Sequence, residues 1–186
     1  MRNIEKKLVE WLDKKLATNG LAQKSIEDKD ARTLFRLAAE ACVGEKEITH
    51  NKSPLIELLQ KTVDGSADRE PYCMCAVQSW LAYAEKKTGI KSPIFASEHC
   101  LTVWAKTPKS SRVKKIPAQG AIVIWQHGTS SAGHTGVMLS YENKTMNTCE
   151  ANTGSQSMRE GDGIFYRTRS TTATGRMKVV GYLKPF

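Results

Sequence analysis

The chain has 186 residues, of which 40% are hydrophobic and 25% are charged, an ordinary composition for a globular protein. A chain of this length can bury roughly two-thirds of its unfolded surface as one domain, and it contains no run of about 18 apolar residues that would predict a transmembrane helix. The formal net charge of +9 favours a polyanionic partner, such as nucleic acid, teichoic acid or an anionic membrane or wall surface, although the basic residues are scattered as on a solvated surface.

The N-terminus and the cysteines bear on where the chain is made. Residues 1–8 are strongly charged and lack the apolar core of a signal peptide, so we expect synthesis in a cytoplasm without general export. The cysteines are odd in number and lack framework spacing, which favours free thiols over a disulfide scaffold. They are Cys42, Cys73, Cys75, Cys100 and Cys149.

Helical periodicity dominates the first third of the chain. Apolar residues recur at three- and four-residue steps over residues 1–19, which predicts an amphipathic helix. A second helix is expected over residues 29–43, with Asp28 or Asp30 as its N-cap. Pro54 begins a third, because proline is favoured at the first helical position.

The segment from Pro71 to Trp80 places a cysteine at the start of an expected helix over residues 73–87. A helix N-terminus presents unpaired N–H groups and positive partial charge, which favour the thiolate form of Cys73. Cys75 is the rival nucleophile, because two residues along a helix turn by about 200° and only one of the two can face a cleft. Cys73 also begins the apolar stripe of the helix, so a buried core thiol is the alternative.

The second half of the chain has the pattern of a sheet. Ser97 is the expected N-cap of one more short helix. After Pro108, short apolar runs alternate with Gly, Asn, Ser and Thr, which is typical of strands. Helices followed by antiparallel strands indicate an α+β fold. The expected strands span residues 121–125, 134–141, 145–150, 163–169 and 177–184.

His134 is the candidate base for the thiol. Gly133 and Gly136 flank it and would leave room around the imidazole for a peptide-like substrate. A base needs an orienting partner on its other nitrogen, and Glu150 and Asn152 lie at the end of the next strand, beside the start of its antiparallel neighbour. Cysteine, then histidine, then carboxylate or amide is the order found in papain-like thiol hydrolases. A satisfied structural histidine is the alternative.

A zinc site is a second alternative for the cysteines. Cys73 and Cys75 with the adjacent pair His99 and Cys100 supply four zinc-type ligands, but neither pair has the usual internal spacing. The sequence therefore assigns no metal and no cofactor.

Four segments, in order, resemble the CHAP family of cysteine, histidine-dependent amidohydrolases and peptidases. They resemble its Pro-Trp-Cys-x-x-x-Val, Pro-x-x-Gly-Asp-Ile-Val, Gly-His-Val-Gly-Ile and Glu-Gly-Asn-Thr blocks. The segments are Pro71-Tyr72-Cys73 with Val77, residues 117–125, residues 133–137 and residues 149–153. The chain departs from the family at Ala121, which replaces Asp, and at Ala151, which replaces Gly. The Asp run that binds calcium in some members is not evident.

The resemblance implies a papain-like fold, with N-terminal helices packed on a C-terminal antiparallel β-sheet. It covers about residues 36–186 and leaves residues 1–35 as a helical extension. It implies that Cys73 is the nucleophile and that His134 is the base that later protonates the leaving amine.

Further roles follow from the same resemblance. Glu150 would hold the imidazole tautomer, and Asn152 would be a second orienting group or a substrate contact. Tyr72, Gly133 and Trp125 are the expected substrate contacts. The Cys73 backbone N–H and a nearby side chain, for which Tyr72 is the candidate, would meet the oxyanion.

The expected function is hydrolysis of an amide bond in peptidoglycan, as in phage endolysins released by a holin. A bacterial effector delivered by a secretion machine is an alternative with the same chemistry, and a non-catalytic basic binding protein is an alternative of another class. We expect a monomer that acts in the periplasm or cell wall, with peptidoglycan and anionic wall polymers as partners, without nucleic acid or an integral membrane segment. The sequence leaves open the bond that is cut, the host range and any contribution of Cys75.

Overall fold

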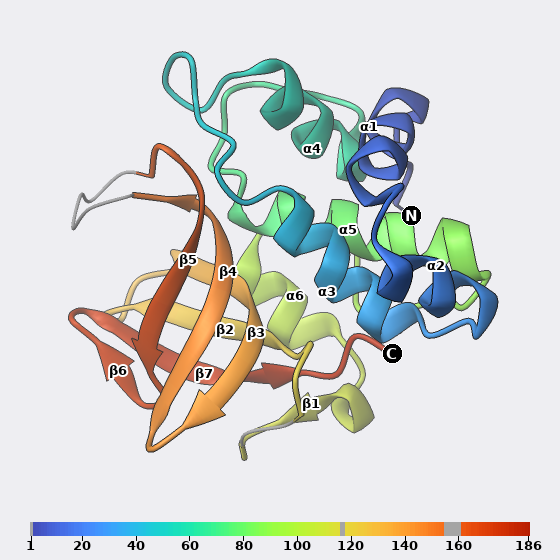
Figure 1. Cartoon of the computed structure of the whole chain (residues 1–186). Helices are drawn as coiled ribbons and strands as arrows, with labels where there is room; N and C mark the ends of the chain where they lie inside the picture. Colours follow the sequence, from blue (N-terminus) through green and yellow to red (C-terminus); the bar gives the residue numbers. More distant parts are fainter. Residues whose placement is uncertain (1, 116–117, 155–160) are drawn as a thin grey trace.

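The computed structural model describes residues 2–115, 118–154 and 161–186 of the chain (Figure 1). Helices fill the first part and strands the second, which confirms the expected α+β order. The helices are α1 (Lys6–Leu16), α2 (Gly20–Glu27), α3 (Ala31–Ala41), α4 (Pro54–Asp64), α5 (Cys73–Thr88) and α6 (Cys100–Lys106), followed by a short 3₁₀ turn (Lys109–Ser111). The strands are β1 (Arg112–Val113), β2 (Ile122–His127), β3 (Gly133–Glu142), β4 (Thr145–Thr153), β5 (Gly163–Ser170), β6 (Ala173–Thr174) and β7 (Met177–Leu183).

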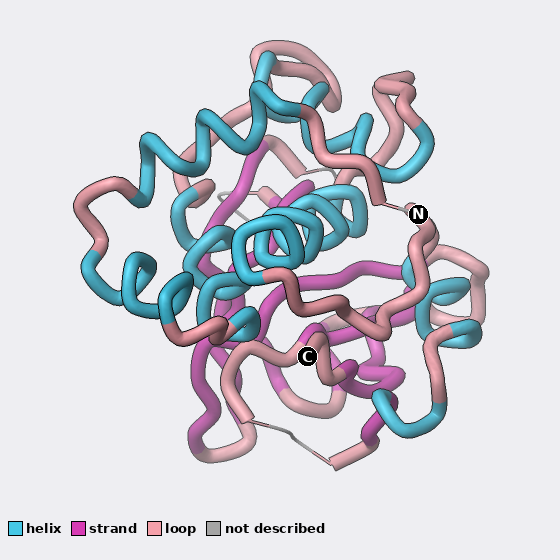
Figure 2. Tube along the Cα trace, turned by 90° about the vertical axis from the view of Figure 1, so that its right-hand side faces the viewer, coloured by secondary structure: helices cyan, strands magenta, loops and turns pink. Residues whose placement is uncertain are grey.

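The strands form one antiparallel sheet in the order β1-β7-β2-β3-β4-β5, with β6 paired to β7. Figure 1 shows this sheet on one side of the molecule and α1 to α4 on the other. In the view turned by 90° in Figure 2, one helix is seen end-on at the centre, and the strands lie mainly in the lower half of the molecule. Consecutive strands β2, β3, β4 and β5 are neighbours, which brings residues close in sequence to one region of the sheet.

Helix α5 is the central element of the fold. It packs against α3 and α4 on one side and against β3 and β4 on the other. Nearly all of its side chains are buried, as expected for a helix that is apolar around most of its circumference. Cys73, the first residue of α5, therefore lies between the helical layer and the sheet.

Side-chain capping explains the starts of α2, α3 and α4. The Asp30 side chain accepts a hydrogen bond from the Thr33 N–H and begins α3, and Ser53 caps α4 ahead of Pro54 in the same way. Asn19 accepts from the Ala22 N–H, so it begins α2, a helix that the sequence analysis did not predict. An asparagine followed by glycine can end one helix or cap the next. The sequence pattern alone did not show that Asn19 also begins a new helix.

The expected N-cap of α6 was wrong. This helix begins at Cys100 with His99 at the capping position. The Ser97 side chain accepts from the His99 N–H at 3.2 Å, so it orders the turn before the helix.

The N-terminal helices share the core of the rest of the chain. Leu8, Leu12 and Leu34 lie in the same buried cluster as Val77 and Ile124. The expected division between residues 35 and 36 falls inside α3. None of the described helices is long and apolar enough to cross a membrane.

Candidate active site

Cys73 is the first residue of α5, as predicted, and its side chain is 5% exposed. The first N–H groups of a helix have no acceptor within the helix, and the Met74 backbone donates a hydrogen bond to the Cys73 sulfur. The His134 imidazole is a second hydrogen-bonding partner of this sulfur. The thiol is therefore buried, but it lies among groups that stabilise its anion.

His134 lies near the start of β3, and its Nε2 is 2.9 Å from Oε2 of Glu150 at the far end of β4. The antiparallel register pairs Val137 with Cys149, so the start of β3 runs beside the end of β4. With Nε2 committed to Glu150, Nδ1 is the nitrogen left to share a proton with the sulfur of Cys73. The side chains of Cys73, His134 and Glu150 are therefore connected by hydrogen bonds in the same order as in the sequence.

Trp125 forms the wall behind this imidazole. It pairs with His134 across β2 and β3, and the two rings stack with centroids 5.7 Å apart and planes 28° from parallel. Because Trp125 is fully buried, it restrains the imidazole and presents no free face to a substrate in this structure.

Glu150 is a fully buried carboxylate with several donors. The Arg169 guanidinium donates from Nε to Oε1 at 2.9 Å and from Nη2 to Oε2 at 2.5 Å, and the Thr148 hydroxyl donates to Oε1 at 2.5 Å. Burial alone raises the pKa of Glu150, but Arg169 and His134 outweigh it and lower the pKa to about 2. The carboxylate therefore stays ionised and holds His134 as a hydrogen-bond donor.

Arg169 and Thr148 were not predicted as site residues. Thr148 precedes Glu150 by two positions on β4, and Arg169 lies opposite Met146, so all three side chains share one face of the sheet. Period-two alternation along the expected strands at 145–150 and 163–169 was the available signal. Without the strand register, however, nothing selected Arg169 from the other basic residues of the segment.

Cys100 brings a second thiol to the site. Its Sγ lies 3.8 Å from Sγ of Cys73, and both side chains are buried. A hydrogen bond from Cys100 lowers the pKa of Cys73 well below its ordinary value, and His134 adds to this effect against the cost of burial. The pKa of Cys100 is raised for the reciprocal reason, so Cys100 keeps its proton and donates it.

The pKa of His134 completes the electrostatics of the site. Burial alone lowers it, but the hydrogen bonds with Cys73 and Glu150 outweigh this and raise the pKa to about 9. At neutral pH the pair is therefore a thiolate and an imidazolium, which are the charge states needed for attack on a carbonyl and protonation of a leaving group.

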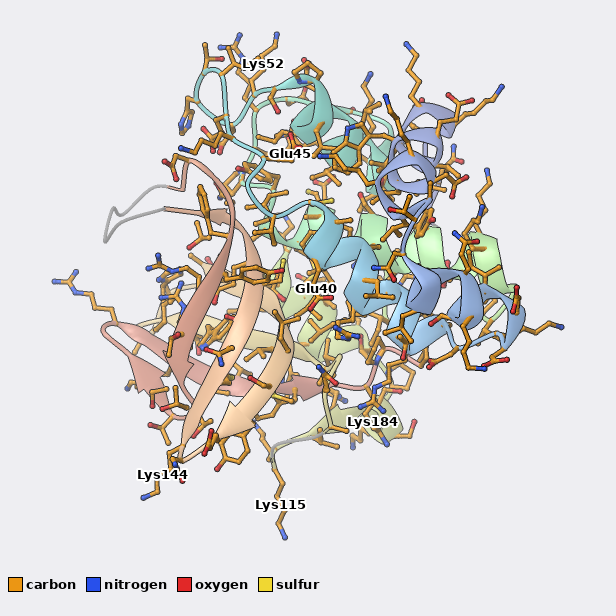
Figure 3. All side chains as sticks on the ribbon, viewed as in Figure 1. Glu40, Glu45, Lys52, Lys115, Lys144 and Lys184 are labelled. Atoms are coloured by element: carbon orange, nitrogen blue, oxygen red, sulfur yellow. The ribbon has the colours of Figure 1, made fainter. Side chains whose placement is uncertain are left out.

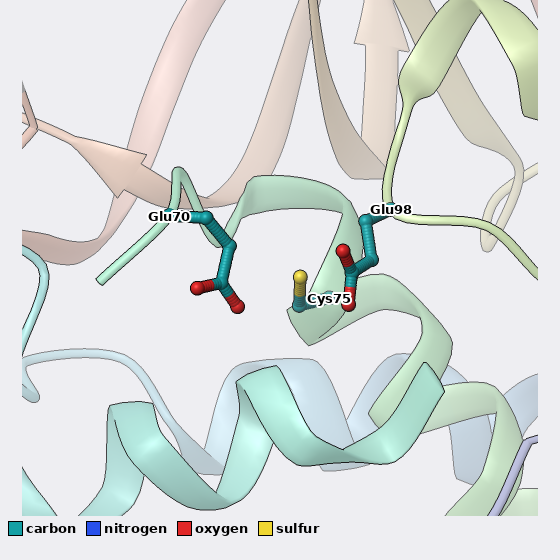
Figure 4. A group of neighbouring side chains, drawn as sticks. All are labelled: Glu70, Cys75 and Glu98. Atoms are coloured by element: carbon teal, nitrogen blue, oxygen red, sulfur yellow. The ribbon is translucent and has the colours of Figure 1, made fainter. Parts of the chain in front are cut away.

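Cys75 lies in different surroundings from Cys73. Figure 4 shows its sulfur between the carboxylates of Glu70 and Glu98, and the ligand atoms of these three residues lie within 4.8 Å of one another. Burial and the nearby carboxylates raise the pKa of the Cys75 thiol, and burial with neighbouring acidic groups raises that of Glu98 to about 7. Cys75 is therefore a protonated thiol at neutral pH and a poor nucleophile.

The zinc alternative drawn from Cys73, Cys75, His99 and Cys100 is not assembled. Cys73 and Cys100 face each other, whereas Cys75 faces the carboxylates and His99 is exposed. Among the described residues, Glu70, Cys75 and Glu98 form the group whose spacing could hold a metal ion.

Two expected substrate contacts have other roles in this structure. Tyr72 is fully buried, and its hydroxyl donates to Oε1 of Glu47 at 3.1 Å, so it is not available as an oxyanion donor. A Cβ on Gly133 would lie 2.8 Å from the Trp125 carbonyl oxygen and 2.9 Å from Cβ of Cys100. Gly133 therefore permits close packing of α6 on β3, whereas the glycines beside His134 had predicted open space for substrate.

Asn152 lies at the end of β4 with a left-handed φ of 53°, which asparagine tolerates better than most residues. Its backbone hydrogen-bonds the Tyr72 hydroxyl, which links the end of β4 to the start of α5. The described contacts do not bring its side chain to His134, so its role as an orienting group or a substrate contact remains a prediction.

The comparisons with known proteins agree with this geometry. Residues 65–152 match the family model of the CHAP domain, a range that contains Cys73, His134 and Glu150. Pro117, in the second of the four sequence blocks, also falls in this range but lies outside the described residues. Comparison with curated proteins and with solved structures gave no match. Residues 65–152 are therefore a CHAP domain, and such domains are typically cysteine- and histidine-dependent amidohydrolases or peptidases.

Proposed function

We propose that this protein is a peptidoglycan hydrolase that cleaves an amide bond through a thioester on Cys73. The observation that carries the proposal is the connected set of Cys73, His134 and Glu150, in which the thiolate and imidazolium are stabilised together. The CHAP domain match supports peptidoglycan as the substrate class.

In the acylation step, the Cys73 thiolate attacks the carbonyl carbon of the scissile amide. The tetrahedral oxyanion is met by N–H groups at the start of α5, where the helix dipole also favours negative charge. His134 then gives its proton to the departing nitrogen, the C–N bond breaks, and a thioester with a free amine remains.

Deacylation returns the enzyme to its starting state. Neutral His134 takes a proton from a water molecule as the water attacks the thioester, and the C–S bond breaks to give a carboxylic acid and the Cys73 thiolate. Glu150 remains ionised throughout and stabilises each imidazolium, because Arg169 compensates its charge.

The charge distribution is consistent with a wall substrate. Figure 3 shows Lys52 at the top of the molecule and Lys115, Lys144 and Lys184 at separate points along its lower part. A dispersed positive charge attracts an extended polyanion over many orientations and defines no single groove for it. We therefore propose that anionic wall polymers concentrate the enzyme near its substrate.

The proposed substrate lies outside the cytoplasmic membrane, so the protein must reach it from its site of synthesis. We propose release by a holin, as for phage endolysins, with delivery as an antibacterial effector as the alternative. Lysis assays with added protein and expression with and without a holin would separate these routes from the chemistry itself.

Mass spectrometry of digested peptidoglycan tests the hydrolase. Purified walls of several types are incubated with wild type, Cys73→Ala and Cys75→Ala, which changes a buried thiol on the same helix outside the catalytic set. New amino termini or freed stem peptides from wild type and Cys75→Ala, but not from Cys73→Ala, would support the proposal and identify the bond. No products from wild type on any wall, with the protein folded, would contradict it.

A further inference from the structure

Cys100 is a thiol that the proposed hydrolysis does not consume. Its sulfur lies 3.8 Å from the nucleophilic sulfur, and both cysteines are 5% exposed. They come from different elements, because Cys73 begins α5 and Cys100 begins α6 after the loop that follows residue 88. A second thiol in contact with the proposed nucleophile could form a disulfide with it.

We propose that Cys73 and Cys100 form a reversible disulfide when the protein meets a peroxide, and that Cys100 is the resolving thiol that protects the nucleophile from irreversible oxidation. The sulfurs must approach from 3.8 Å to a bond length of about 2 Å. Cys100 lies at the first position of a short helix, so a small movement of the helix start supplies this approach. The inference rests on the proposed function only for its activity readout.

The chemistry proceeds in two balanced steps. The Cys73 thiolate attacks hydrogen peroxide, the O–O bond breaks, and Cys73 becomes a sulfenic acid as hydroxide leaves. The sulfur of Cys100 then attacks the sulfur of Cys73 and loses its proton, the S–O bond breaks, and water leaves. In sum, two thiols and one peroxide give one disulfide and two waters, and a dithiol such as dithiothreitol reverses the change.

The same electrostatics order these steps. The negative sulfur of Cys73 holds the proton on Cys100 in the resting enzyme, so Cys73 is the thiol that meets the oxidant. Once Cys73 is a neutral sulfenic acid, that charge is gone and Cys100 loses its proton more readily. His134 gives its proton to the hydroxide that leaves in the first step, so its neutral imidazole, one hydrogen bond away from Cys73, is then placed to accept the proton of Cys100.

The other cysteines are poorly placed to compete. Cys75 faces Glu70 and Glu98, and burial raises the pKa of its thiol. Cys42 and Cys149 are fully buried and donate to the backbone carbonyls of α3. A specific Cys73–Cys100 bond is therefore expected, not a mixture.

The test treats wild type, Cys100→Ser and Cys75→Ser with hydrogen peroxide and then with dithiothreitol. Intact-mass and peptide analysis should show a loss of about 2 Da and a Cys73–Cys100 cross-link in wild type and Cys75→Ser. Cys100→Ser should instead accumulate a gain of about 32 Da on Cys73, the mass of a sulfinic acid. After dithiothreitol, the fraction of starting peptidoglycan hydrolysis recovered should be on the order of tenfold higher in wild type than in Cys100→Ser.

The mass readout separates the two proposals. A Cys73–Cys100 cross-link in a protein without wall hydrolysis would support the redox pair and contradict the hydrolase. Sulfinic acid on Cys73 of wild type at the same rate as in Cys100→Ser, or a cross-link from Cys73 to Cys75, would overturn the redox proposal. If Cys100→Ser fails to fold, the cross-link map of wild type alone decides the outcome.

Discussion

Nε2 of His134 lies 2.9 Å from Oε2 of Glu150, and this contact joins the start of β3 to the far end of β4. The two residues belong to different strands, and the antiparallel pairing of β3 and β4 brings their side chains together. Because Arg169 neutralises Glu150 from the next strand, the carboxylate can orient the imidazole without drawing its proton away. The orientation of the proposed base therefore depends on three adjacent strands.

Thiol reactivity at low pH should single out Cys73. Iodoacetamide at pH 6 should alkylate Cys73 well before the four other cysteines, because hydrogen bonds from Cys100 and His134 lower its pKa and the remaining thiols have raised values. His134→Gln should slow this reaction at pH 6 by at least about tenfold, the effect of one pKa unit. Peptide mass spectrometry over time measures both rates. Faster labelling of Cys75 would show that the nucleophile is misassigned.

Hydrolysis should decline on the alkaline side as His134 loses its proton. The pKa of His134 is raised to about 9, so the imidazolium that protonates the leaving amine is present below this pH and is lost above it. We expect kcat/KM to fall tenfold per pH unit beyond about 9. His50→Gln is the matched control, since His50 is exposed in the loop before α4 and should leave this limb unchanged. An alkaline limb near pH 7 in wild type would argue against the ion pair.

Removing Arg169 should destabilise the fold as well as the site. Arg169→Met leaves the buried Glu150 carboxylate without its main counter-charge, at an expected cost of about 3–5 kcal/mol in the free energy of unfolding. Arg169→Lys keeps the charge but loses the two-point hydrogen bonding to the carboxylate. Its free energy of unfolding should therefore lie between those of wild type and Arg169→Met. Urea unfolding measures the series. Arg167→Met on the same strand, whose side chain donates to the Gly154 carbonyl, is the control and should cost clearly less.

Gly136 should tolerate no side chain. A Cβ there would lie 2.6 Å from Cγ of Glu150 and 2.9 Å from the Cys149 carbonyl oxygen, so Gly136→Ala must displace β4 or the Glu150 side chain. We expect a loss of about 1–3 kcal/mol in stability, together with reduced hydrolysis. Gly20→Ala is the matched control, because a Cβ at Gly20 meets nothing within 4 Å. Equal melting temperatures for the two variants would contradict the packing described for Gly136.

The sequence could single out the proposed nucleophile and base because their signals are local. Cys73 follows Pro71 at a helix start, and His134 lies between two glycines at a strand start; both patterns are visible within a few residues. Glu150 was predicted from the pairing of consecutive strands, which needs only a short connection between β3 and β4. The helix-then-strand order likewise gave the α+β class.

Contacts between distant segments could not be predicted in the same way. Arg169 reaches Glu150 only through the register of β4 and β5, and Cys100 reaches Cys73 only because α6 packs on β3 over the bare backbone of Gly133. The expectation of open space around His134 was wrong for the same reason, because neighbouring strands and α6 pack directly against Gly133 and Gly136. The sequence by itself determined which residues are the candidates for the proposed chemistry, through helix termini and strand periodicity. The tertiary structure decided which side chains tune them, because the burial and hydrogen bonding that shift a pKa depend on neighbours brought together by packing.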